Sequence, residues 1–201
     1  MKNIAVFASG KGSNFEAIAK TVKSGMLKVN LALLVCDNQQ AAVLGKARKA
    51  GVPVALIKRQ DFASKADFEK AIISRLKENA IDLIVLAGYM RMLSAPFVHE
   101  FRGRVINIHP SLLPAFKGES GIKDAFDYGV KVTGVTVHFV DEEMDHGPVI
   151  LQREVAITGK DTLDTLEAKI HKIEHRIYPE AIKLFVQGKL KIKGRKVIRL
   201  R

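Results

Sequence analysis

Short runs of Val, Ile and Leu recur through the first half of the chain, and segments with helical periodicity separate them. We predict five buried strands from these runs, at Lys2–Ala8, Asn30–Cys36, Val54–Ile57, Asp82–Ala87 and Val105–Ile108. The intervening segments predict helices at Asn14–Ser24, Gln40–Ala50 and Lys65–Asn79. Strands that are apolar throughout must be covered on both faces, which favours parallel pairing with right-handed helical crossovers. The sequence therefore predicts an α/β fold with a Rossmann-like, doubly wound, mostly parallel sheet.

The pattern changes in the second half of the chain. Val132–Val140 alternates between apolar and polar side chains, and Pro148–Val155 is suited to pair with it across a turn. A long helix is predicted at Leu163–Phe185, followed by a basic hairpin at 189–201. We expect a mixed or antiparallel extension of the sheet within a single domain. A single domain is expected because no linker or repeat interrupts the chain. Its two halves are expected at about 1–100 and about 101–188.

Bulk properties exclude several classes of protein. A 201-residue chain with 47% hydrophobic residues can build a core without disulfides, and its single cysteine, Cys36, cannot form one within the chain. No apolar run approaches the ~20 residues of a membrane span, so we expect a cytoplasmic protein with no membrane partner.

The net charge of +12 raises the question of nucleic acid, but much of the excess lies at the very end of the chain. The residues are Lys189, Lys191, Lys193, Arg195, Lys196, Arg199 and Arg201. No aromatic residues are interleaved with basic ones as in single-strand binding surfaces. We therefore expect small-molecule, anionic partners rather than nucleic acid, and a homodimer is a possible assembly.

Ligands of doubly wound sheets bind beyond the carboxyl ends of the strands, where the segment Ser9-Gly10-Lys11-Gly12-Ser13-Asn14 lies. Its glycines and the following helix start favour an anion such as phosphate. An NAD-binding module is the alternative, with Asp37 as the ribose-binding acid, but Phe15 stands where the third glycine belongs. A simple strand-to-helix turn is the structural alternative.

A second polar segment, Asn107-Ile108-His109-Pro110, ends another buried strand. Asn107 and His109 are two residues apart and thus project to the same face. An amide beside a histidine can bind a carbonyl oxygen and supply a proton to it. We expect this segment and the glycine loop to meet at one edge of the sheet, although a histidine satisfied by local hydrogen bonds remains the alternative.

The acidic turn Asp141–Pro148 supplies a third candidate. Glu142 and Glu143 are expected to be solvated, whereas Asp145 can turn inward before Gly147. A carboxylate beside a histidine stabilises the imidazolium, which would keep the acid form of His109 available.

No metal site is predicted. The six histidines are scattered, and His171 and His175 lack a third ligand nearby in sequence. A Ser-His-Asp hydrolase is not supported, because the Gly-x-Ser-x-Gly motif is missing.

Together these segments resemble the folate-dependent formyltransferases, and the similarity to the glycinamide ribonucleotide formyltransferases runs nearly end to end. The segments that carry the resemblance are Ser9–Asn14, Leu86–Leu93, Asn107–Pro114, Gly134–Val140, Asp145–Pro148 and Glu174-His175. The resemblance implies transfer of a formyl group from 10-formyltetrahydrofolate, as co-substrate, to the amine of 5-phosphoribosylglycinamide in purine synthesis. It implies no metal.

The resemblance also implies roles for individual residues. Asn107 and His109 would polarise the formyl oxygen, and Asp145 would tune His109 and help move protons. The ribonucleotide would be held by Gly12, Ser13, Asn14 and Glu174, and the folate by Lys65, Met90, Arg91, Met92, Leu93 and Asn107. Lys65 replaces an arginine of some members, which keeps the charge but loses the planar fork. Lys11 and the loop Ala115–Gly121 vary within the family and are assigned no role.

Related enzymes are the alternatives within this class. Formyltetrahydrofolate deformylase and methionyl-tRNA formyltransferase resemble the same core but carry additional domains, so the chain length argues against both. The basic tail lies outside every matched segment, and its deletion is expected to affect stability or solubility more than chemistry.

Overall fold

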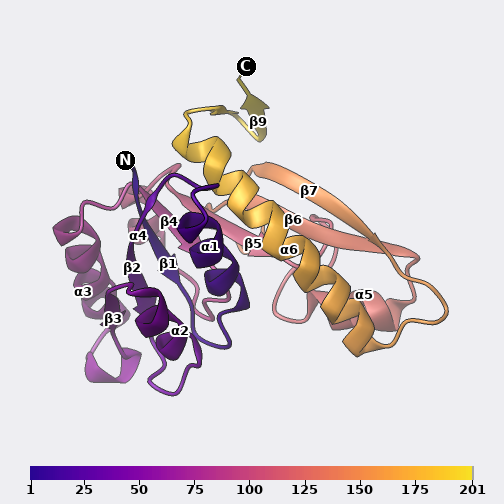
Figure 1. The fold of residues 1–201 in the computed structure, drawn as a ribbon, viewed down its shortest axis with the longest axis horizontal. Coiled ribbons are helices and arrows are strands. Elements are labelled where there is room, and N and C mark those ends of the chain that lie inside the picture. Colours follow the sequence, from indigo (N-terminus) through magenta and orange to yellow (C-terminus); the bar gives the residue numbers. More distant parts are fainter. Residues whose placement is uncertain (201) are drawn as a thin grey trace. The chain divides into compact units, whose positions relative to one another are not determined.

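The structure is a computed structural model that describes residues 1–200. The chain falls into two compact units, Met1–Ile106 and Asn107–Arg201 (Figure 1). The boundary lies inside one strand, β5 (Val105–His109). That the chain acts as one domain with two functional halves stays a prediction.

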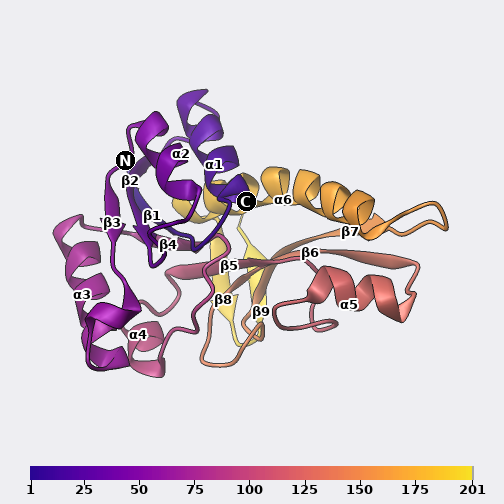
Figure 2. The same cartoon turned by 90° about the horizontal axis from the view of Figure 1, so that it is seen from below.

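The first unit contains four parallel strands in the order β3-β2-β1-β4. They are β1 (Asn3–Phe7), β2 (Asn30–Cys36), β3 (Val54–Leu56) and β4 (Leu83–Leu86). Helices α1 (Ser13–Lys23) and α2 (Val43–Ala50) cover one face of this sheet (Figure 2). Helices α3 (Lys65–Glu78) and α4 (Ala95–Glu100) cover the other, and η1 (Arg59–Asp61) precedes α3. Strands β1 and β4 are buried along nearly their whole length, as continuous apolar runs require.

Side-chain capping explains where α3 and α4 begin. The Ser64 side chain accepts a hydrogen bond of 3.0 Å from the Asp67 N–H at the start of α3. Ser94 caps α4 in the same way, because its Oγ accepts a hydrogen bond from the Phe97 N–H.

Helix α2 begins at Val43 rather than at Gln40 as predicted. The Asn38 side chain accepts from the Gln40 N–H at 2.9 Å and holds that residue in a turn.

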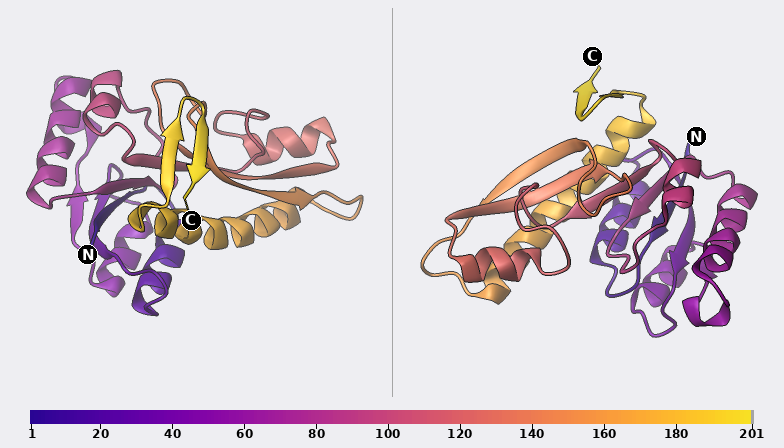
Figure 3. Two further views of the ribbon diagram at one scale, coloured as in Figure 1. Left: turned by 90° about the horizontal axis from the view of Figure 1, so that it is seen from above. Right: turned by 180° about the vertical axis from the view of Figure 1, so that it is seen from behind.

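The second unit extends from β5 through β6 (Val132–Phe139) and β7 (Val149–Ala156), which pair antiparallel. The long helix α6 (Leu163–Val186) packs against both β6 and β7, and α5 (Gly121–Tyr128) packs against α6. Strands β8 (Leu190–Lys193) and β9 (Lys196–Arg199) form the basic hairpin. Figure 3 shows this hairpin beside the start of β7, where Val149 pairs with Lys196.

The predicted fold class is confirmed, with a parallel sheet covered by helices and antiparallel strands toward the C-terminus. Three short elements were not predicted, namely η1, α4 and α5. The longest of them has eight residues, too few to repeat a helical period clearly. Among residues 1–200, no helix is both long enough and apolar enough to cross a membrane.

Candidate active site

Three predicted residues, Asn107, His109 and Asp145, converge within the second unit. Asn107 and His109 lie at the carboxyl end of β5, and Asp145 lies in the turn between β6 and β7. His109 Nδ1 is 3.3 Å from Asp145 Oδ2, and the Asn107 amide nitrogen donates to Asp145 Oδ1 at 3.4 Å. The side chains of His109 and Asp145 are only 5% and 9% exposed, so their mutual interaction is little weakened by water. The turn thus brings a carboxylate to the amide and imidazole, as the sequence predicted.

Both ring nitrogens of His109 face oxygen atoms. Nε2 lies 2.7 Å from the carbonyl oxygen of Phe116, which can only accept, and Nδ1 faces the Asp145 carboxylate. Both nitrogens can donate at once only when the imidazole is protonated. Space around the ring is tight, because a Cβ added at Gly121 would lie 3.1 Å from Nε2. The geometry therefore suits a histidine that carries a proton to a reacting group.

Asp145 has a strained backbone and a well-bonded side chain. Its φ of 49° is in the left-handed region that non-glycine residues rarely adopt. Oδ2 accepts a hydrogen bond of 2.9 Å from the Gly118 N–H. Burial by itself raises the pKa of Asp145, but the interaction with His138, the hydrogen bond from Gly118 and the charge of His109 outweigh it, so that the pKa is lowered. The carboxylate is thus held in its charged form. Glu142 and Glu143 in the same turn are exposed, as predicted.

His138 is a member of this cluster that the sequence reasoning missed. It lies on β6, is 2% exposed, and its Nε2 is 3.7 Å from Asp145 Oδ1 and 3.4 Å from the Asn107 amide nitrogen. Its Nδ1 faces the carbonyl oxygen of Phe139 at 2.8 Å, so Nδ1 carries a hydrogen. The signal available in the sequence was a histidine on the strand that leads directly into the acidic turn.

Buried hydrogen bonds hold the loop that follows β5. The Thr136 hydroxyl donates to the carbonyl oxygen of Ser111 at 2.7 Å and accepts from the Leu113 N–H at 3.1 Å. Gln152 donates to Thr136 Oγ1 and to the carbonyl oxygen of Leu113. Gly134 allows this close packing, because a Cβ there would lie 2.6 Å from a Leu112 methyl group. The strand pair β6–β7 therefore fixes the peptide chain just beyond His109.

The glycine loop lies in the first unit, between β1 and α1. Gly12 has φ of 67° and packs so closely on α2 that an added Cβ would lie 2.4 Å from a Val43 methyl group. Only glycine satisfies both conditions. Ser13 and Asn14 open α1, and the first N–H groups of a helix have no partner within it. This loop can therefore bind an anion through its backbone.

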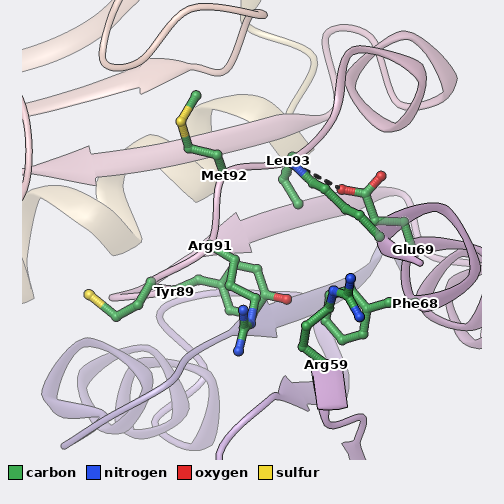
Figure 4. A pocket seen from close by; sticks show the side chains of 9 residues that line it. Arg59, Phe68, Glu69, Tyr89, Arg91, Met92 and Leu93 are labelled. Atoms are coloured by element: carbon green, nitrogen blue, oxygen red, sulfur yellow. Dashed lines mark ion pairs between the residues drawn. The ribbon is translucent and has the colours of Figure 1, made fainter. Parts of the chain in front are cut away.

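The predicted folate-binding residues except Asn107, which belongs to the second unit, line a pocket of about 280 Å³ in the first unit (Figure 4). Its walls comprise Arg59, Lys65, Phe68, Glu69, Tyr89, Met90, Arg91, Met92 and Leu93. The Arg91 guanidinium lies 5.8 Å from the centre of the Phe68 ring. Among the described residues, the Tyr89 hydroxyl is buried without a hydrogen-bond partner, and burial raises the pKa of Tyr89. The pocket combines an apolar and aromatic wall with cationic groups, which suits a flat ligand that carries carboxylates.

Asp37 connects the glycine loop with this pocket. Its carboxylate accepts a hydrogen bond of 2.6 Å from the Ser9 hydroxyl and pairs with Arg91 Nε at 2.5 Å. The Ser9 hydroxyl in turn accepts from the Met90 N–H at 3.1 Å. The Asp37 carboxylate is therefore bonded to Ser9 and Arg91 of the chain itself, whereas in an NAD-binding module it would bind a ribose hydroxyl.

Glu174 lies on α6, where it is 4% exposed and its Oε2 is 2.9 Å from His171 Nδ1. The rings of His171 and His175 are stacked with centroids 6.3 Å apart. Within residues 1–200, no group of three or more His, Cys, Asp or Glu side chains is arranged to hold a metal ion. Glu174 and His109 belong to the second unit and the glycine loop to the first. Their meeting at one site stays a prediction.

Comparisons with known proteins agree on one family. A family model described as Formyl transferase matches residues 2–182. The phosphoribosylglycinamide formyltransferase of Bacillus subtilis is 49% identical over 183 residues, which are 91% of this chain and 94% of the relative. The crystal structure of glycinamide ribonucleotide transformylase 1 from Symbiobacterium toebii has 43% identity and a TM-score of 0.97 over 100% of this chain and 95% of that chain. A formyltetrahydrofolate deformylase from Pseudomonas syringae shares the fold, with a TM-score of 0.92 but 23% identity, over 100% of this chain and 66% of its own.

Proposed function

Because this chain belongs to the formyl transferase family, we infer that it transfers a one-carbon formyl group in purine synthesis. The donor is 10-formyltetrahydrofolate and the acceptor is the amine of 5-phosphoribosylglycinamide. The observation that carries the proposal is the convergence of Asn107, His109 and Asp145 in one buried cluster. The alternative of a deformylase rests on a more distant relative, with which the likeness shows the fold alone.

The proposed reaction needs a polarised carbonyl and one proton transfer. The amine nitrogen forms a bond to the formyl carbon, the bond from that carbon to N10 of the folate breaks, and a proton passes from the amine to N10. Asn107 and His109 donate hydrogen bonds to the formyl oxygen as it becomes negatively charged in the tetrahedral intermediate. Asp145 stabilises the charged form of His109 and accepts and returns protons.

Substrate binding requires a local change around His109 in the second unit. The Nε2–H of His109 is engaged by the carbonyl oxygen of Phe116, and its Nδ1 faces Asp145. The formyl oxygen can receive the Nε2 hydrogen only if the Phe116 carbonyl releases it. The loop Ala115–Gly121, for which the sequence predicted no role, therefore acts through its backbone.

The remaining assignments divide between the two substrates. The backbone of Gly12, Ser13 and Asn14 binds the phosphate of the ribonucleotide, and Glu174 contributes a further contact. Lys65, Met90, Arg91, Met92 and Leu93, with Asn107, bind the folate. Arg59 and Lys65 place two cations on the wall of the pocket, where they match the glutamate carboxylates of a folate. We expect the enzyme to act in the cytoplasm on these small molecules, without a metal ion.

A spectrophotometric assay tests the function directly. The protein is mixed with 5-phosphoribosylglycinamide and a 10-formyl folate, and the absorbance change on loss of the formyl group is followed. We expect deformylation only when the amine is present, and almost none with His109→Gln. Equal rates with and without the amine would identify a hydrolase instead. Saturable binding of a nicotinamide cofactor would instead favour an NAD-binding module. Retention of duplex DNA at physiological salt would favour a nucleic-acid-binding protein.

A further inference from the structure

The turn that carries Asp145 is tightly folded. Asp145 itself has the left-handed φ of 49°, and Gly147 approaches Phe139 so closely that an added Cβ would lie 1.8 Å from the Phe139 carbonyl oxygen. A non-glycine residue stays in this backbone region only where its surroundings hold it there. Contacts from outside the turn must therefore hold the peptide that follows Asp145.

The peptide after Asp145 is bound by a side chain from the C-terminal hairpin. Arg195 lies in the turn between β8 and β9, and its Nη2 donates to the carbonyl oxygen of His146 at 2.6 Å. Its Nη1 lies 2.9 Å from Nε2 of the His146 ring and 3.1 Å from Nδ1. The two prongs of one guanidinium thus engage both the backbone and the ring of the residue next to Asp145.

The His146 ring is also held from the other side, by Asp141. Nδ1 lies 2.8 Å from Asp141 Oδ2, a carboxylate that can only accept, so Nδ1 carries the hydrogen. Arg195 Nη1 lies within 3.1 Å of both ring nitrogens and therefore contacts the ring as a whole, while the directional hydrogen bond of Arg195 is the one to the His146 carbonyl oxygen. A chain of contacts from Asp141 through His146 to Arg195 closes the turn on both sides of Asp145.

The hairpin is placed for this contact by backbone pairing. Lys196 of β9 pairs in parallel with Val149 of β7, three residues after His146. Most residues of the hairpin are exposed, so little apolar burial accompanies its docking. The hydrogen bond from Arg195 to the His146 carbonyl oxygen is consequently a specific contact rather than a by-product of core packing.

We propose that Arg195 is a positioning residue for formyl transfer, which holds the His146 peptide and thereby keeps the Asp145 carboxylate directed at His109 and Asn107. This inference rests on the proposed function. Arg195 lies beyond the residues 2–182 that match the family model. The proposal departs from the expectation that deletion of the basic tail affects stability or solubility more than chemistry.

The test compares Arg195→Gln with Arg199→Gln, which removes an equal charge from the same hairpin. We expect Arg195→Gln to lower kcat roughly 10- to 100-fold with little change in KM, because small displacements of a catalytic group have effects of that size. Arg195→Lys should retain only part of the rate, since an ammonium lacks the planar fork that contacts the His146 carbonyl oxygen and ring together. Arg199→Gln should remain near wild type.

A double mutant separates positioning from general destabilisation. If Arg195 acts through Asp145, Arg195→Gln should cause almost no further loss in the Asp145→Asn background. The same fold loss in both backgrounds, or equal activity of Arg195→Gln and Arg199→Gln, would overturn the proposal.

Amide hydrogen exchange provides a readout that needs no activity. The Gly118 N–H donates to Asp145 Oδ2, so its exchange should accelerate in Arg195→Gln but not in Arg199→Gln. Unchanged protection of Gly118 would overturn the inference even if the rate fell. The wild-type protein could also fail to transfer a formyl group while the Gly118 N–H still exchanges faster in Arg195→Gln. That result would refute the proposed function but leave the positioning of Asp145 by Arg195 intact.

Discussion

The carboxylate of Asp145 lies 3.3 Å from Nδ1 of His109, although the residues come from a turn and a strand that are 36 positions apart. Both side chains are almost fully buried. A charge pair in such surroundings is expected to act as one unit, and this relationship leads to the first prediction.

Asp145→Asn should lower kcat by ~10²–10⁴-fold, because it removes the charge that supports a protonated His109 while keeping the shape of the side chain. His109→Gln should cost a similar factor, and the double mutant should lose much less than the product. Steady-state kinetics at saturating substrates measures all three. Glu142→Gln and Glu143→Gln are the controls and should be near neutral. Equal losses at all three acids would mean that the turn acts only through its general negative charge.

The lowered pKa of Asp145 predicts how stability depends on pH. A carboxylate with a lowered folded pKa contributes stability that is fully present above its ordinary value of 3.8. That contribution is lost as the pH falls through the lower folded value. Urea unfolding of wild type and Asp145→Asn at a series of acidic pH values measures this loss. Below about pH 4 the difference should shift in favour of the Asn variant. A difference that stays constant down to the acid transition would contradict this.

Asp37→Asn should weaken the framework shared by the glycine loop and the pocket. Its carboxylate side chain is 7% exposed and is bonded to Ser9 and Arg91, so the loss should cost about 2 kcal/mol of unfolding free energy. KM for both substrates should rise more than kcat falls, because the residue does not touch the reacting cluster. Asp127→Asn, in an exposed pair on α5, is the matched control and should change the unfolding free energy by less than about 1 kcal/mol. Unaltered KM values in Asp37→Asn would show that substrate binding by the glycine loop and the pocket does not depend on the contacts of Asp37 with Ser9 and Arg91.

Gly121→Ala should impair catalysis through the space around His109. The added methyl group would lie 2.9 Å from the Phe116 carbonyl oxygen and 3.1 Å from His109 Nε2, so one of them must move. We expect kcat to fall roughly 10- to 100-fold. Gly45→Ala, at an open position inside α2, is the control. It should keep full activity and stabilise the protein by up to about 1 kcal/mol. Thermal unfolding of both variants separates a shifted histidine from a general loss of structure.

The order of elements could be predicted from the sequence because each long element repeats its own period. Asn30–Cys36 matches β2, and the predicted helix Leu163–Phe185 differs from α6 by one residue. The short helices α4 and α5 could not be predicted, because fewer than three turns display little periodicity. Capping by Ser94 and docking against neighbouring elements define them instead.

The sequence by itself determined the chemical groups of the reacting cluster. Asn107 and His109 share a face because alternate residues of a strand do so, and they end a buried strand, where ligands of such sheets bind. Asp145 could be distinguished from Glu142 and Glu143 by the Gly-Pro that follows and by the family motif. These inferences depend on side-chain identity and local spacing, both of which the sequence contains.

Only the tertiary structure decided what supports those groups. The Phe116 carbonyl, the Gly118 N–H and the His146 carbonyl are backbone atoms, and every residue presents the same ones. The sequence therefore contains no signal that distinguishes them. Arg195 is one of many basic residues in the tail, and its contact with His146 arises because β9 pairs with β7 across 47 positions of chain. Such long-range pairing is set by the packing of the whole unit, and local sequence patterns do not encode it.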